Sequence, residues 1–106
     1  MALTRDFRDT IRERAQRDAG FRRALLQEAV EQMLAGEMDL SKSMIRNYIN
    51  ATVGFPALAE AVHTRSESLM RMFGARGNPS MSNLIGVIAA LQNQEGVHFR
   101  VKAVSA

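Results

Sequence analysis

The chain contains no cysteine and no tryptophan, and its 106 residues include one tyrosine, two histidines and two prolines. Without cysteine neither a disulfide framework nor a thiolate zinc site can form, and a reducing compartment is the natural setting. No segment approaches the run of about 20 apolar residues that spans a bilayer. The N-terminal residues carry charges where a signal peptide has an apolar run. We therefore expect a cytoplasmic protein without a membrane partner.

Side chains suited to catalysis are also scarce. His63 and His98 stand far apart in the sequence, and the carboxylates are scattered over helical faces without the spacing of metal ligands. An enzyme needs a nucleophile, a base or a metal. The sequence therefore predicts no catalytic site, no metal site and no cofactor, and we do not expect an enzyme.

The positive charge is concentrated in the second half of the chain. The net charge is +3, and residues 65–106 carry five arginines and lysines against two acids. An excess on one face suits contact with a polyanion, although a charge of this size is common in other proteins. In residues 5–23 arginines and acids interleave at helical spacing, which indicates an ordinary solvated face. A nucleic-acid arm and a membrane-surface helix are the alternative interpretations of that segment.

Hydrophobic periodicity predicts three helices in the first half of the chain, over residues 4–17, 19–35 and 39–53. Leu3, Phe7 and Ile11 lie on one face of the first. Asp18 is a candidate N-cap for the second helix, and Gly36 and Gly54 are candidate stops. We expect these helices, as segment 1–53, to form a packing or partner-binding surface.

The second half, segment 54–106, has shorter predicted helices, which are separated by clear turn and loop residues. The pattern predicts a short helix beginning at Pro56, a turn at His63 and Thr64, and a helix over 65–73. Thr64 and Glu67 have the spacing of a capping box. After the loop 74–79, Ser80 begins the most apolar helix, which ends at Gly96. On the 65–73 helix the pattern places Leu69, Met72 and Phe73 inward and Ser66, Glu67, Met70 and Arg71 outward.

The C-terminal residues alternate between apolar and polar side chains. Val97, Phe99 and Val101 are separated by His98 and Arg100, which predicts a short strand with one wet face. A lone strand needs a partner, so we expect it to pair with its copy in a dimer or with another protein. The expected fold class is all-α, with about six helices and this short strand.

The helix-turn-helix spacing rests on Ala59, the turn at His63 and Leu69. It resembles the phage-repressor (Cro-like) family. From Tyr48 onward the chain resembles bacterial addiction-module antidotes, through Leu58-Ala59, Ser66, Ser68 and Leu69, Gly77-Asn78-Pro79 and the helix Asn83-Leu84-x-x-Val87-Ile88-x-Ala90-Leu91. The family usually has glycine in the turn, where the backbone tends to be left-handed, and here His63 stands there. The resemblance implies a helix-turn-helix transcriptional regulator, an antitoxin-type autorepressor that acts as a dimer and has a possible toxin partner.

In that fold the 65–73 helix would enter the major groove of double-stranded DNA. Glu67 could accept from a cytosine amino group, and Arg71 could reach a guanine or a phosphate. Two interpretations of Glu67 stay open, because a capping box would already employ it. The predicted DNA-binding residues are Arg65, Ser66, Glu67, Met70, Arg71, Arg76, Asn78 and Ser80.

Two other functions compete with DNA reading. The first is a protein-interaction module that neutralises a toxin or binds another partner without reading DNA. The second is RNA binding, which the scarcity of aromatic side chains disfavours, because single-strand readers stack bases on aromatic rings.

Overall fold

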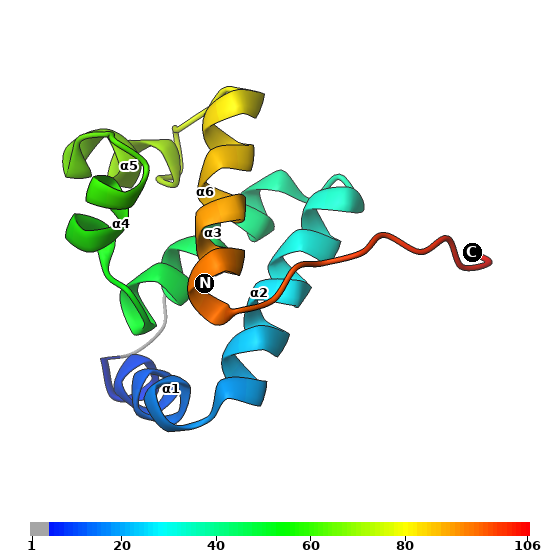
Figure 1. Cartoon of the computed structure of the whole chain (residues 1–106), viewed down its shortest axis with the longest axis horizontal. Helices are drawn as coiled ribbons and strands as arrows, with labels where there is room; N and C mark the ends of the chain where they lie inside the picture. Colours follow the sequence, from blue (N-terminus) through cyan, green and yellow to red (C-terminus); the bar gives the residue numbers. More distant parts are fainter. Residues whose placement is uncertain (1–4) are drawn as a thin grey trace.

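The computed structural model describes residues 5–106, and within this range every regular element is an α-helix (Figure 1). The helices are α1 (Arg5–Arg17), α2 (Ala19–Leu34), α3 (Met38–Ala51), α4 (Phe55–Ala61), α5 (Ser66–Met72) and α6 (Met81–Glu95). The prediction of about six helices is therefore confirmed. Leu3 and Thr4, which the sequence assigns to the first helix, lie outside the described residues.

Local chemistry explains where most of these helices begin and end. The Asp18 carboxylate accepts from the backbone N–H of Phe21 at 3.1 Å, and the Ser80 hydroxyl accepts from that of Asn83 at 3.1 Å. The predicted N-cap at Asp18 is thus confirmed, and the last helix begins at Ser80 as predicted, with Ser80 as its N-cap. Gly36 and Gly96, at the ends of α2 and α6, have φ of 86° and 68°. Only glycine adopts this backbone without a steric cost, so these two stops are confirmed as well.

The third helix begins one residue earlier than the sequence predicts. Its N-cap position is Glu37, which makes no side-chain cap bond, and Asp39 lies in the first turn instead. An acidic side chain in the first turn interacts favourably with the positive end of the helix dipole. Asp39 therefore favours a helix start here even though it is not the N-cap.

One hydrophobic cluster holds the fold together. Its buried members come from five helices and their ends, namely Leu26, Ala29, Ile45, Tyr48, Ile49, Phe55, Leu58, Ala59, Leu69, Phe73, Leu84, Val87, Ile88 and Leu91. The apolar helix α6 lies in the middle of this arrangement, between the α4–α5 pair and α2 (Figure 1). The division at residue 54 stays a prediction, and buried residues from both sides of it share this cluster.

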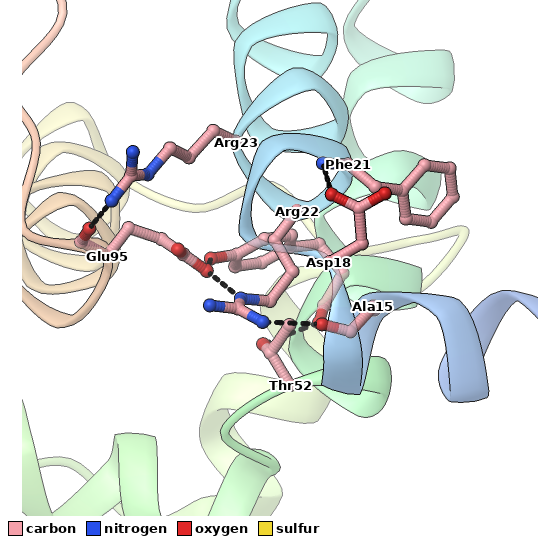
Figure 2. A network of polar contacts seen from close by, with 8 residues as sticks. Ala15, Asp18, Phe21, Arg22, Arg23, Thr52 and Glu95 are labelled. Atoms are coloured by element: carbon pink, nitrogen blue, oxygen red, sulfur yellow. Dashed lines mark hydrogen bonds and ion pairs between the residues drawn. The ribbon is translucent and has the colours of Figure 1, made fainter.

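A polar network around Glu95 crosses the buried part of the molecule (Figure 2). Its Oε1 accepts from Arg22 Nε at 2.9 Å and from the Tyr48 hydroxyl at 2.5 Å. A second nitrogen of Arg22 donates to the carbonyl of Ala15 at 2.6 Å, and Arg23 donates to the carbonyl of Glu95 at 3.2 Å. The buried carboxylate is therefore paired and hydrogen-bonded, and it ties α6 to α2, α3 and the end of α1.

The predicted C-terminal strand is wrong for this chain. Residues 97–106 form no regular element, and the end of the chain extends away from the helices (Figure 1). A strand is held by ladder hydrogen bonds to a neighbouring strand, and residues 5–106 supply none. The backbone N–H of Phe99 instead donates to Oε1 of Gln92 at 2.8 Å, and the Phe99 ring packs against the hydrophobic cluster. Val101 and Val104 remain exposed.

Among the described residues no helix combines the length and the apolar character needed to cross a membrane.

We expect Tyr48→Phe to lower the free energy of unfolding by about 1.5–3 kcal/mol at neutral pH, because the hydroxyl donates to a charged acceptor. Burial, and next the hydrogen bond to Glu95, raise the pKa of Tyr48 above its ordinary value near 10. A raised folded-state pKa means that the contribution is full below about pH 10 and is lost as the pH rises further. Urea unfolding of both proteins from pH 7 to 11 should show their difference shrinking above pH 10. A difference independent of pH would contradict this assignment.

Candidate nucleic-acid interface

The candidate site is built on α4, α5 and the turn between them, residues 62–65. His63 has a φ of 54°, the only positive value at a non-glycine residue among residues 5–106. The N–H of Thr64 bonds the carbonyl of Ala59 at 2.9 Å, and the N–H of His63 bonds that of Glu60 at 3.3 Å. This pairing ends α4 and redirects the chain into α5. The left-handed turn that the sequence places at His63 is therefore present.

One side of α5 is anchored in the hydrophobic cluster. Leu69 and Phe73 are fully buried, and Met72 is partly buried and packs against the hydrophobic cluster. The predicted inward residues are confirmed. A seven-residue helix is not stable alone in water, so this burial is what keeps α5 helical.

The predicted capping box is wrong. The N-cap of α5 is Arg65, without a side-chain cap bond, and the Thr64 hydroxyl donates to the carbonyl of Val62 at 3.3 Å. Because the backbone of Thr64 already completes the end of α4, the first turn of α5 starts one residue later. The Glu67 side chain is 76% exposed and has Arg65 Nε at 4.0 Å. Of its two interpretations, the capping role is excluded.

The opposite side of α5 faces solvent. Arg65, Glu67 and Arg71 are exposed, Met70 is exposed by 54%, and Ser66 is half-buried at the flank. These are five of the residues that the sequence predicts for DNA contact; four belong to α5, and Arg65 is its N-cap. Their side chains present charge, a hydroxyl and a thioether to the outside.

Two cations on α3 hold the end of α5, and sequence reasoning missed both. Arg46 donates to the carbonyl of Phe73 at 2.9 Å, and Lys42 donates to those of Gly74 at 3.3 Å and Gly77 at 2.6 Å. Lys42 is only 7% exposed. Positive charge is favourable at the carbonyl end of a helix. The i, i+4 spacing of Lys42 and Arg46 indicates a shared face, but no pattern links them to carbonyls about thirty residues away.

The loop after α5 returns very close to it. A Cβ on Gly77 would overlap the carbonyl oxygens of Arg71 and Met72 and lie 2.6 Å from the carbonyl carbon of Met72. Next to this contact Arg76 and Asn78 are exposed and line a small hollow of about 300 Å³ together with Ser68 and Arg71. Arg76 and Asn78 are thus brought beside α5, as the sequence-based hypothesis requires.

Ser80 lies at the start of α6, where its hydroxyl oxygen is the cap acceptor for Asn83. A hydroxyl that accepts a hydrogen bond still has its own proton to donate. Ser80 therefore keeps one donor for a further contact.

A larger cleft, of about 890 Å³, lies on the other flank of α5. Its lining includes Arg8 and Arg12 of α1, Arg46 of α3, and Ser66 and Met70 of α5. In Figure 1, α1 and the α4–α5 pair lie on the same side of the molecule, with the end of α3 between them. The sequence interprets the α1 arginines as an ordinary solvated face, and it contains no signal that they reach this cleft.

Within residues 5–106 no three His, Cys, Asp or Glu side chains are grouped so that they could hold a metal ion. The exposed side of α5 presents hydrogen-bonding groups and charge. Arginine donates two parallel bonds to phosphates or base edges, and a carboxylate accepts from amino groups.

We expect Gly77→Ala to destabilise the fold by about 1–3 kcal/mol, because the added methyl group must push two backbone segments apart. Gly86→Ala is the matched control. No atom lies within 4 Å of a Cβ at that position in α6, and alanine there should raise stability by about 0.5–1 kcal/mol. Thermal unfolding followed by circular dichroism measures both. Equal midpoints for the two variants would show that the close approach at Gly77 is not maintained in solution.

Comparison of the chain with protein-family models, with curated proteins and with solved structures finds no match. The function of the chain is therefore inferred from the geometry of this surface.

Proposed function

We propose that the chain is a sequence-specific double-stranded DNA-binding regulator that inserts α5 into the major groove. The observation that carries the proposal is the division of α5 into a buried side and a charged, exposed side. Lys42 and Arg46 hold its carbonyl end, and the turn at His63 ends the preceding helix. A helix held at both ends presents its outer side chains in a defined direction, which base reading requires.

The exposed residues divide into two roles. Glu67 has no capping duty and accepts from a cytosine amino group, whereas Arg71 donates to a guanine or a phosphate. Met70 contacts a thymine methyl group, and Ser66 hydrogen-bonds at the edge of the groove. Arg65, Arg76, Asn78 and Ser80 contact phosphates, and these contacts set the register of the protein on the duplex.

A single copy offers few base contacts, because α5 has seven residues and is about 10 Å long. Useful specificity therefore requires a homodimer on two half-sites, spaced by about 34 Å or one helical turn. The role that we propose is autorepression by an antitoxin-type regulator in the cytoplasm, with a toxin as the possible protein partner. It requires no enzymatic activity and no cofactor.

A protein-interaction module is the second candidate, and one surface favours it. Leu34, Met38 and Leu40 are exposed around the turn between α2 and α3. Apolar side chains gathered at one place on a surface are typical of a protein contact. This surface belongs to segment 1–53 and contains none of the proposed DNA-contacting residues, so both functions can coexist.

We expect Arg71→Ala to weaken binding to the specific sequence by about 1–3 kcal/mol while it changes binding to scrambled DNA much less. In vitro selection from random duplexes first identifies the preferred sequence, and fluorescence anisotropy then measures both affinities. The physical reason is that a bidentate contact to guanine is lost on one base pair only.

Arg17→Ala is the control, because Arg17 is exposed at the far end of α1 and lines neither hollow. Its affinity should match that of the wild type. An equal loss of Arg71→Ala on specific and scrambled DNA would make Arg71 a phosphate contact. A selection that enriches no sequence would contradict the proposed function itself.

A further inference from the structure

We propose that the cleft between α1 and α5 holds one sugar–phosphate strand of the bound duplex, and that Arg8 and Arg12 contact its phosphates. This inference rests on the proposed function and extends the interface to the N-terminal helix. The charge pattern of residues 5–23 alone indicates an ordinary solvated face. The inference instead assigns a ligand to part of that face.

The placement of hollows around α5 is the first observation. Ser66 and Met70, one turn apart, line the cleft of about 890 Å³ on one flank. Ser68 and Arg71 line the smaller hollow of about 300 Å³ on the other flank. Glu67 is exposed between these flanks. The exposed ridge of α5 is therefore bordered by a hollow on each side.

A duplex has the matching shape. Its major groove is about 12 Å wide, and a helix inside it has one sugar–phosphate strand on each side. With the ridge of α5 in the groove, one strand lies over the smaller hollow, beside Arg76 and Asn78. The other strand then lies over the larger cleft, whose far wall is α1.

The charge of the cleft suits this occupant. Its lining contains three arginines, Arg8, Arg12 and Arg46, and one acid, Asp9. Arg8 and Arg12 are exposed to solvent along this lining. Arg46 donates from one nitrogen to the carbonyl of Phe73. Phosphate contacts by arginine and lysine supply most of the sequence-independent affinity for DNA.

A small anionic ligand is the competing occupant, because a volume near 890 Å³ is within the range of small-molecule sites. The continuity of the cleft with the exposed side of α5 favours the DNA strand. Met70 is exposed on α5 and also lines the cleft, so a duplex that contacts Met70 also lies against the cleft.

The test compares Arg12→Gln with Arg17→Gln, two exposed arginines on the same helix, of which only Arg12 lines the cleft. Both variants lose one positive charge. Affinity for the selected duplex and for a scrambled duplex is measured across a salt series. We expect Arg12→Gln to reduce the slope of log affinity against log salt by about 0.9, equally for both duplexes, and Arg17→Gln to leave it unchanged. Arg12→Lys, which keeps the charge, should retain the wild-type slope.

Phosphate-ethylation interference on the selected duplex gives an independent readout. The wild type and Arg17→Gln should share a set of sensitive phosphates on the strand beside α1, and Arg12→Gln should lose some of them. Equal slopes for the two glutamine variants would overturn the inference while leaving the proposed function intact, and the cleft would then be a site for a small anion or for no ligand. If the wild type selects no sequence, the proposed function fails, and this inference fails with it.

Discussion

Two cations of α3 and the backbone carbonyls that they bind determine where α5 lies. Lys42 and Arg46, one turn apart, donate to the carbonyls of Phe73, Gly74 and Gly77, where α5 ends and the chain turns back. Burying an ammonium group is unfavourable unless the group is hydrogen-bonded. Moving the loop away from the buried Lys42 would therefore destabilise the fold. A helix of seven residues has little stability of its own, and these bonds together with the burial of Leu69 and Phe73 provide its orientation.

The backbone constraints at the two ends of α5 leave its outer side chains free of structural duties. His63 accepts the left-handed conformation that the turn needs, and Gly77 permits a contact with Arg71 and Met72 that no side chain would allow. Because turn and loop are held by backbone hydrogen bonds and by α3, the exposed residues Glu67 and Arg71 need not stabilise the fold.

The network around Glu95 connects α6, α2 and α3 with the N-terminal helix α1. Glu95 of α6 binds Arg22 and Tyr48, and Arg22 also binds the carbonyl of Ala15 near the end of α1 (Figure 2). A buried carboxylate with this many donors has few alternative arrangements, because each lost bond leaves a charge uncompensated. Arg22 thereby links α1 to the core, and α1 forms one wall of the cleft beside α5.

Sequence alone determined the features that depend on neighbours along the chain. The helix cap at Asp18, the helix start at Ser80, the stops at Gly36 and Gly96 and the inward face of α5 all follow from spacing and backbone preference. The left-handed turn at His63 is what the family resemblance implies. The capping box failed because the end of α4 uses Thr64, and the strand failed because alternation cannot supply a partner strand. Only the tertiary structure decided that Lys42 and Arg46 meet the end of α5 and that Arg8 and Arg12 line a cleft beside it. Such contacts join residues about thirty to sixty positions apart, and their targets include backbone carbonyls, which every residue carries and no sequence pattern marks.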